Sequence, residues 1–421
     1  MDLNELTAVS PIDGRYWKNV SRLAEYFSEF ALIRYRVQVF LAYYQLQTNE
    51  KVSLNFSLKD AAEIKKQEDK IHHDIKAVEY WLQAKVKQPA KLHFGLTSED
   101  VDSLVFGLAL KEANNDLLAP TIGTLANRLD NLAKRWGGIV MLGRTHGQPA
   151  VPTTMGKELK NFAVRIEKIL VKLKNYKFEA KLTGATGNFN ALMAVDPKKD
   201  WLKFSDQFIV GFGLIPNHFT TQILPYDNWL EYFSFIKLLN NVLIGFCQDI
   251  WRYISDDYLV QILQKETVGS STMPQKINPI DFENAEGNLG MANALIEYFE
   301  RKLPISRLQR DLSDKTVKRN FGLALAHALL AYQNISAGLD KIALNEEKIR
   351  QDLDNHWEII AEGVQTLLRA GGDKNAYEKI KDLTRGRKIT KNDWERFLHK
   401  NKLKKLSPQS YVGLAEKLAK L

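Results

Sequence analysis

The stretch GSSTMPQKINP, Gly269–Pro279, concentrates side chains that could do chemistry. It holds two serine hydroxyls, a lysine amine and an asparagine amide between glycine and proline breaks. Its two prolines and polar composition exclude a helix interior. One interpretation is a solvated surface turn. The other is a lid that brings a base or nucleophile to a bound anion. This stretch by itself leaves both open.

A second polar stretch surrounds a histidine. GRTHGQPA, Gly143–Ala150, places His146 between glycine-bounded turns, beside arginine, threonine and glutamine. A loop histidine is often structural or solvated. Imidazole is nevertheless the side chain best suited to act as a general acid or base near neutral pH. His146 is therefore a candidate for proton transfer.

A third polar stretch, HFGLTSED at His93–Asp100, resembles the start of a helix. Thr97 or Ser98 is a plausible N-cap, with acidic residues in the first turn that follows. A capped helix start is also an anion site, because its unpaired N–H groups and hydroxyls face the same point.

The pair His73 and Asp74 is expected to lie on a helix surface, with the neighbouring His72 on a different face. That placement and the missing HExxH spacing argue against a metal site. The sequence also lacks GxGxxG after a strand, GxxxxGK[ST], GxSxG and CxxC. These absences argue against nucleotide-cofactor enzymes, P-loop enzymes and α/β hydrolases.

Long helices must position these polar stretches. Between Asn228 and Leu263 apolar residues recur at helical spacing along one broad stripe. Other long helices are expected from Pro152 through Leu173, and over Ser103–Trp136, Phe282–Leu303 and Lys315–Ala337. KLTGATGNFNA, residues 181–191, is a glycine-rich break between helices. Strand signals are few and short, so the sequence predicts an all-α fold with an elongated bundle.

Composition shifts divide the chain into three expected domains. Candidate boundaries fall near residues 87–96 and 337–345. They give a mixed helical N-terminal domain over 1–90, a central long-helix bundle over 91–339 and a small helical domain over 340–421, whose tail is rich in lysine.

The 421 residues are 45% hydrophobic and 26% charged, which is ordinary for a globular protein with a sizeable core. No run approaches about 18 apolar residues, and the first residues lack the basic flank and apolar run of a signal peptide. The single cysteine, Cys247, lies in the apolar run VLIGFC and is expected to be a buried hydrophobe. These features favour a cytoplasmic protein without a membrane span.

The formal net charge of +9 admits two kinds of partner. A basic surface can bind nucleic acid. A positive cleft can equally concentrate a small anionic substrate. Composition does not choose between them.

Three polar stretches on long helices, the last reading GSSTMPQKINP, resemble the fumarase/aspartase superfamily of lyases. The corresponding segments are TSEDVDS (Thr97–Ser103), GRTHGQPAVPTTMGKE (Gly143–Glu158) and GSSTMPQKINPIDFENAEGN (Gly269–Asn288). Within the superfamily, three segments of this chain resemble the bacterial type of adenylosuccinate lyase: SPIDGRY (Ser10–Tyr16), HDIKAVEY (His73–Tyr80) and DFENAEGNLG (Asp281–Gly290).

The resemblance implies a C–N lyase of purine biosynthesis. Such enzymes cleave adenylosuccinate to AMP and fumarate, and the succinyl-carboxamide ribotide SAICAR to AICAR and fumarate. The family is a homotetramer around a twenty-helix core, and each active site draws on three subunits. It implies no metal, no organic cofactor, no nucleic acid and no membrane.

The resemblance also assigns catalytic roles. His146 matches the general acid and Ser270 the general base. Thr97 and Ser98 match residues that hold the succinyl carboxylate. The neighbours of the base that match its anion-binding surroundings are Ser271, Lys276, Ile277 and Asn278.

Further matches concern the nucleotide. Arg15 and Tyr16 match an N-terminal substrate-binding pair, and Gln222 a substrate-binding glutamine. His73 and Asp74 match the family's HD pair, preceded here by His72 instead of asparagine. The remaining nucleotide contacts match Asn284, Arg310, Lys315, Thr316, Val317, Lys318 and Arg319. Two positions depart from the family: Gln275 replaces a frequent histidine, and Lys315 stands where a serine is expected near the phosphate.

The implied reaction is a β-elimination, and it explains why such residues are needed. A proton leaves the carbon next to a carboxylate, so the intermediate needs cations and hydrogen-bond donors such as Lys276 and Asn278. A serine such as Ser270 is a base only if its alkoxide is stabilised and water is excluded, which a closing lid would do. His146 would protonate the departing nitrogen, and His73 would contact substrate or orient the acid. The phosphate needs arginine forks, for which Arg15, Arg310 and Arg319 are candidates.

Two alternatives stay open. Argininosuccinate lyase has a similar MPQK loop but no phosphate to bind, and SPIDGRY together with the arginines at 310–319 argues against it. A non-catalytic, RNA-binding helical scaffold would be expected to have lost Ser270, His146 or Lys276, and all three are present.

Overall fold

The computed structural model describes residues 2–262, 272–273 and 275–421. The fold is mostly helical, which confirms the all-α prediction. The described strands form three short pairs: β1 (Val140–Thr145) with β2 (Gln148–Thr154), β3 (Glu179–Ala180) with β4 (Ile215–Pro216), and β5 (Leu259–Gln261) with β6 (Ile342–Leu344). The first and third pairs are antiparallel and the second is parallel.

The chain forms two compact units. The first comprises residues 1–122, 169–241 and 287–333, and the second comprises 123–168, 242–286 and 334–421. The division into three domains predicted from composition stays a prediction.

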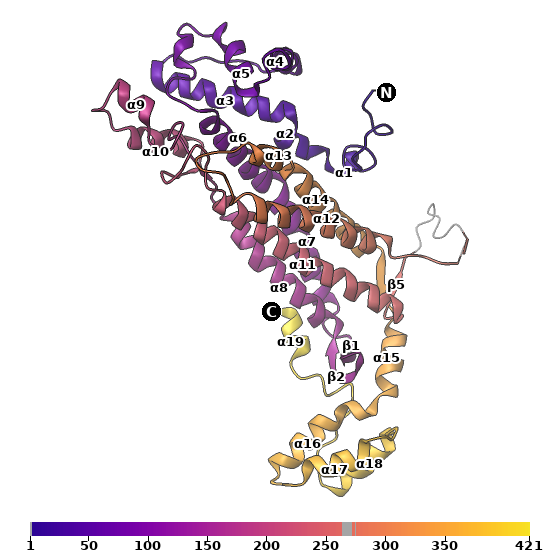
Figure 1. Ribbon diagram of the computed structural model, residues 1–421. Coiled ribbons are helices and arrows are strands. Elements are labelled where there is room, and N and C mark those ends of the chain that lie inside the picture. The colour runs from indigo at the N-terminus through magenta and orange to yellow at the C-terminus, as the bar shows by residue number, and fades with distance from the viewer. Residues whose placement is uncertain (1, 263–271, 274) are drawn as a thin grey trace. The chain divides into compact units, whose positions relative to one another are not determined.

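The first unit begins with short turns of helix and continues into three helices that lie together in Figure 1: α3 (Glu29–Thr48), α4 (Leu58–Ile71) and α5 (Asp74–Gln83). The preceding turns are α1 (Trp17–Val20), η1 (Ser21–Leu23) and α2 (Ala24–Phe27). Ser28 caps α3 by accepting a hydrogen bond from the Ala31 N–H at 3.1 Å. Asn49 ends α3 in the left-handed region. Local capping therefore sets where this helix begins and ends.

The helix predicted over Ser103–Trp136 is longer and less regular than expected. It begins at Ser98 as α6 (Ser98–Ala113), passes through a π-helical turn, η3 (Asn114–Leu118), and continues as α7 (Ala119–Arg135). The Asn114 amide donates to the Leu173 carbonyl at 2.9 Å. This bond gives a partner to the amide nitrogen of a side chain that is fully buried at the π turn.

The other long helices are α8 (Met155–Lys174), α11 (Asp227–Ser255), α12 (Ile280–Lys302) and α14 (Phe321–Leu339). Two predicted bounds were wrong. The helix expected to reach Leu263 ends at Ser255, where Asp257 turns the chain into β5 with φ 59°. The helix expected over Lys315–Ala337 is two helices, because α13 (Ser313–Lys318) stops before α14 begins.

Between the long helices lie short connecting elements: η2 (Pro89–Lys91), α9 (Asn190–Val195) and α10 (Trp201–Gly211). The predicted glycine-rich break at residues 181–191 is confirmed as irregular backbone up to residue 189, and α9 begins at Asn190. Gly187 has φ 86°, and a Cβ there would lie 2.1 Å from the Thr220 carbonyl oxygen. Only glycine fits this close approach.

The second unit ends in a small helical group: α15 (Glu346–Asn355), η4 (Trp357–Ile360), α16 (Ala361–Ala370), α17 (Ala376–Thr384), α18 (Lys391–Lys400) and α19 (Ala415–Lys420). Figure 1 shows α16, α17 and α18 together. The buried Trp394 lies in their core with Ile360 and Val364, and its indole N–H donates to the Trp357 carbonyl at 2.7 Å. The core thus holds an aromatic anchor whose polar atom is satisfied.

Among the described helices, α11 alone is long and apolar enough to cross a membrane by length and composition, and 56% of its most apolar window is buried inside the structure. Core helices of globular proteins share these properties. Cys247 on α11 is buried, as predicted, and burial raises the pKa of its thiol.

Candidate active site

The start of α6 is built as the sequence predicts. Thr97 is the N-cap, and its backbone N–H donates to an Asp100 carboxylate oxygen at 2.8 Å. Glu99 and Asp100 occupy the first turn, and each is only 1% exposed. Burying two carboxylates requires partners for both.

Glu99 is held by two of the residues predicted to bind substrate. Lys318 Nζ lies 2.9 Å from one carboxylate oxygen and Arg310 Nη1 lies 2.9 Å from the other. Lys318 also contacts Asp314 at 3.1 Å and donates to the Tyr226 hydroxyl at 3.0 Å. We call these five residues the Glu99 cluster.

The Glu99 cluster is largely closed to solvent. Lys318 has no exposed surface and Glu99 only 1%, and the side chain of Arg310 is 16% exposed. Burial by itself would raise the pKa of Glu99, but the charges of Lys318 and Arg310 lower it to about 2. Burial opposes the charge of Lys318 too, yet Glu99, Tyr226 and Asp314 raise its pKa well above the usual value. Glu99 and Lys318 therefore stay charged at neutral pH.

A second cluster surrounds Asp74. Its carboxylate lies 3.0 Å from Arg36 Nη2, 2.7 Å from Lys315 Nζ and 3.6 Å from Arg319 Nη2. Arg36 also contacts Asp102 at 3.1 Å. We call these five residues the Asp74 cluster. Burial opposes ionisation of Asp74, but Arg36 and Lys315 hold its pKa well below the usual range.

His72 and His73 lie in a break between helices, so the expectation that they occupy different faces of one helix was wrong. Helix α4 ends at Ile71, and His72 follows with φ 53°. His73 is the N-cap of α5, where its Nδ1 accepts from the Lys76 N–H at 3.2 Å. Asp74 is buried and does not lie on a helix surface. The side chain of His73 is half exposed.

Gln222 lies beside the start of α6. Its carbonyl oxygen accepts from Lys181 Nζ at 2.9 Å, and the same amine contacts Asp100 at 2.6 Å. Its backbone N–H donates to the Gln309 carbonyl at 3.2 Å, one residue before Arg310. The first unit therefore brings Gln222 close to two predicted site segments.

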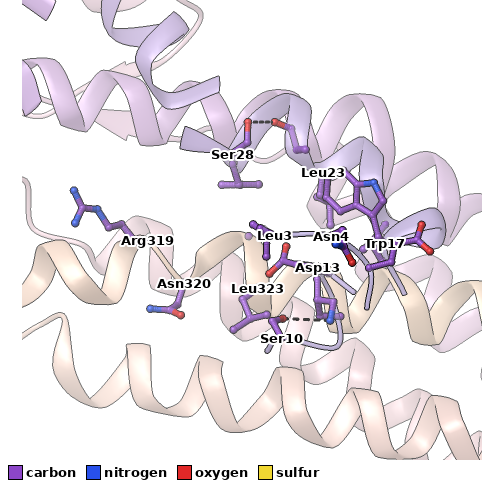
Figure 2. Close-up of a pocket in the computed structure, with 17 residues that line it drawn as sticks. Leu3, Asn4, Ser10, Asp13, Trp17, Leu23, Ser28, Arg319, Asn320 and Leu323 are labelled. Carbon is purple, nitrogen blue, oxygen red and sulfur yellow. Dashed lines mark hydrogen bonds between the residues drawn. The ribbon is translucent and has the colours of Figure 1, made fainter. Parts of the chain in front are cut away.

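A cavity of about 780 Å³ joins the N-terminal stretch to the start of α14. Figure 2 shows Arg319 and Asn320 on one side and Trp17 and Leu23 on the other. Its polar lining residues are Asn4, Glu5, Ser10, Asp13, Ser28, Arg319 and Asn320. Arg15 is exposed and Tyr16 is the N-cap of α1, both beside this lining segment. Part of the SPIDGRY segment and Arg319 thus line the same cavity.

Two further predicted residues, Thr316 and Val317, lie on α13 between Lys315 and Lys318. The Asn320 amide donates to the Thr316 carbonyl at 2.9 Å. Val317 is only 5% exposed. These two residues complete the helical turn that presents the charged side chains.

In the second unit, His146 lies at the tip of the β1–β2 hairpin. His146 and Gly147 form its two-residue turn with φ 53° and 72°, the combination that suits a tight hairpin. Below the tip the strand register shifts between Leu142 and Arg144, where a Cβ on Gly143 would lie 2.4 Å from the Val151 carbonyl oxygen. The hairpin presents an exposed imidazole on a regular scaffold.

Of the polar loop at 269–279, Ser270 and Ser271 lie outside the described residues. Lys276 is exposed, and the Ile277 carbonyl accepts from the Gln261 amide at 2.7 Å. Asn278 is half-buried. Helix α12 then begins at Ile280.

The start of α12 carries two acids, because Asp281 and Glu283 lie in its first turn. Asp281 pairs with Lys341 at 2.7 Å, and Glu283 accepts from the Trp251 indole at 3.1 Å. Asn284 accepts from the Asn334 amide. Both acids thus have partners within the second unit.

Sequence reasoning missed several buried ions that hold the predicted residues: Arg36, Asp102, Lys181 and Asp314. Arg36 had a usable signal, because it shares a helix face with the buried Leu32 and Phe40 at spacings of four. A charge on the apolar face of a helix requires a buried partner. The sequence did not indicate which acid that partner is.

Among the described residues, no group of three or more histidine, cysteine, aspartate or glutamate side chains is arranged to hold a metal ion.

Comparison with known proteins identifies the chain as a lyase, the class that the sequence motifs resemble. Residues 39–293 match the Lyase family, and residues 306–412 match the adenylosuccinate lyase C-terminal family. A fumarate lyase from Mesorhizobium sp. BNC1 superposes with a TM-score of 0.74 over 95% of this chain and 96% of that one, at 18% identity. The β-carboxy-cis,cis-muconate cycloisomerase of Acinetobacter calcoaceticus sp. ADP1 gives 0.74 over 96% and 98%, at 17% identity. The fold is that of the fumarase/aspartase superfamily of lyases.

Relatives in sequence show to which family of lyases the chain belongs. Adenylosuccinate lyase of Legionella pneumophila (strain Philadelphia 1) is 43% identical over 100% of this chain and 99% of its own length. The enzyme of Escherichia coli (strain K12) is 40% identical over 99% of this chain and 98% of its own length. That of Dictyostelium discoideum is 43% identical over 98% of each chain. The chain belongs to the adenylosuccinate lyase family.

Proposed function

We propose that this C–N lyase eliminates fumarate from adenylosuccinate, giving AMP, and from SAICAR, giving AICAR, in purine nucleotide biosynthesis. The observation that carries the assignment of its site is that the Asp74 cluster holds the half-exposed Arg319 in the same unit as the capped N-terminus of α6. That arrangement offers a cation for a phosphate and a helix start for a carboxylate, which are the anionic ends of both substrates.

The succinyl end is assigned to Thr97 and Ser98. They lie at the start of a helix of 16 residues, where N–H groups and hydroxyls converge. Lys276 and Asn278 would add a cation and a donor for the charge that develops on the carboxylate. Gln222 and Asn284 are assigned to the substrate as well.

The phosphate end is assigned to Arg319, with Arg15 and Tyr16 from the neighbouring N-terminal stretch. Arg319 is the most exposed cation of the Asp74 cluster, with 47% of its side chain accessible. Arg310 and Lys318 already serve Glu99, so we assign them to holding α6 and α13 in place. Val317 is assigned to packing.

Proton transfer is assigned to Ser270 and His146. Ser270 would remove the proton from the carbon next to the carboxylate, with Ser271 and Lys276 beside it. The C–N bond then breaks, its electron pair goes to the departing nitrogen, and His146 delivers the proton there. The half-exposed His73 would contact the substrate or orient this acid. His146 lies at the exposed hairpin tip, where a substrate could approach its imidazole, as the role of general acid requires.

We propose a homotetramer with sites shared between subunits. The long helices α11 and α12 support this, because each keeps large apolar side chains exposed, among them Leu238, Trp251, Met291 and Tyr298. We propose a cytoplasmic enzyme that binds neither membrane nor nucleic acid.

Loss of adenylosuccinate absorbance together with fumarate release tests the reaction. The wild type should turn over, and Ser270→Ala should reduce kcat by several orders of magnitude while binding stays near normal. Near-normal turnover by the variant would refute Ser270 as the base. Release of fumarate from argininosuccinate but not from adenylosuccinate would identify the protein as an argininosuccinate lyase instead. Salt-sensitive RNA binding without lyase activity would indicate a non-catalytic RNA-binding scaffold.

A further inference from the structure

The Asp74 cluster contains one more cation than its acids require. Asp74 and Asp102 are its two carboxyl groups, and Arg36 bridges both of them. Lys315 supplies the second positive charge at 2.7 Å from Asp74. Arg319 is therefore the surplus cation of the cluster.

The distances from Asp74 also single out Arg319 as the cation that the carboxylate holds least closely. Arg36 and Lys315 lie within hydrogen-bond range of Asp74 at 3.0 and 2.7 Å, whereas Arg319 stands at 3.6 Å. One oxygen of Asp74 takes Lys315 and the Ile75 N–H, and the other takes Arg36. Three donors thus occupy the carboxylate at hydrogen-bond distance, and Arg319 lies beyond that distance from the oxygen that Arg36 contacts.

Exposure separates Lys315 from Arg319. The side chain of Lys315 is 19% accessible and that of Arg319 is 47% accessible. Arg319 lines the cavity in Figure 2, whereas Lys315 does not. The amine of Lys315 is thus committed to the buried carboxylate, whereas about half of the Arg319 side chain stays accessible to a ligand.

We propose that Lys315 neutralises Asp74 and thereby keeps Arg319 from closing on that carboxylate, so that Arg319 binds the phosphate of the substrate. Lys315 is a positioning residue and does not contact the substrate. This inference rests on the proposed function, because it takes the phosphate as the ligand of Arg319. Without Lys315, the cluster would hold two acids and two cations, and Arg319 would become the second partner of Asp74.

The test is a double-mutant cycle between Lys315→Met and Asp74→Asn, read as KM and kcat for adenylosuccinate. Lys315→Met alone should raise KM about tenfold with kcat changed less than about threefold, because it weakens binding of a non-reacting group. In the Asp74→Asn background, Lys315→Met should change KM less than about twofold, since no charge is left to capture Arg319.

A direct contact between Lys315 and the phosphate gives a different result. Lys315→Met would then raise KM by the same factor in both backgrounds, and this outcome would overturn the proposal. If Asp74→Asn fails to fold, Lys315→Arg replaces it. A guanidinium that still pairs with Asp74 should keep KM within about threefold of wild type, and a KM like that of Lys315→Met would contradict the inference.

Two controls separate this inference from the proposed function. Lys65→Met removes a lysine of another 2.8 Å ion pair, with Glu68 on α4, and should leave KM and kcat unchanged. Arg319→Met should raise KM both in the wild-type background and in the Asp74→Asn background, because Arg319 binds the phosphate in both. If Arg319→Met has no effect, the phosphate assignment fails. If it has an effect while Lys315→Met does not, only the positioning role of Lys315 fails.

Discussion

The two ion clusters of the first unit use the same chemistry in opposite ways. In the Glu99 cluster, two acids face two cations, and Lys318 has no exposed surface. In the Asp74 cluster, two acids face three cations, and Arg319 is about half exposed. A balanced, closed cluster can hold helices in place, whereas an unbalanced, open one can also attract an anion.

The largest expected effect is on the closed cluster. Lys318→Met leaves Glu99 and Asp314 buried with one cation between them, so unfolding free energy should fall by about 3–5 kcal/mol. Chemical denaturation measures this loss, and Lys65→Met, which breaks a surface pair, should cost less than about 1 kcal/mol. Equal effects of the two variants would remove the distinction between the clusters.

The open cluster should respond in binding more than in folding. Arg319→Met should raise KM for adenylosuccinate about tenfold or more, because a charge-assisted contact to phosphate is lost. Its unfolding free energy should change by less than about 1 kcal/mol, since Arg319 is half exposed. Kinetics and denaturation on the same preparation check both halves. A stability loss as large as that of Lys318→Met would contradict the comparison.

Acid should weaken the closed cluster over a defined range. The pKa of Glu99 is about 2 in the folded protein, against an ordinary value near ~4.3 in an unfolded chain. Its contribution is therefore present above about pH 4.3 and is lost as pH falls toward about 2. Glu99→Gln should be less stable than wild type at neutral pH and lose less on acidification through this range. Parallel acid-denaturation curves for the two proteins would count against this assignment.

The smallest expected effect concerns the hairpin that carries His146. Gly147 has φ 72°, a conformation that costs other residues about 1 kcal/mol, so Gly147→Ala should lower stability by roughly that amount. A Cβ there meets no atom within 4 Å, so the cost is purely conformational. Denaturation curves give the value. No loss at all would mean that the turn relaxes, and kcat would then report whether His146 moves with it.

The sequence predicted the helical class and a cap at Thr97 or Ser98, because each depends on local spacing and capping. It could not predict that the cations of Lys315–Arg319 divide into buried and exposed members. Lys315 and Arg319 face Asp74 whereas Lys318 faces Glu99, and this division depends on the turn of α13 and on acids far away in the chain. Arg36 was hidden in an apolar run, and its partners lie far away in the chain.

The early end of α11 and the misplaced histidines share a cause. Asp257 and His72 end regular structure through left-handed backbone, a conformation that glycine and asparagine usually signal. Neither residue is a strong sequence marker for it. The periodic stripe beyond Ser255 consequently looked like more helix, and the paired histidines looked like one helix surface.

Cleavage of adenylosuccinate and of its dephosphorylated nucleoside, each by wild type and by Arg319→Met, tests the central claim most directly. The account predicts that wild type releases fumarate from both and strongly prefers the nucleotide in kcat/KM. Arg319→Met should lose most of that preference while acting on the nucleoside as wild type does. An unchanged preference in the variant would contradict the assignment of the open cluster to the phosphate, and no fumarate from wild type would contradict the reaction itself.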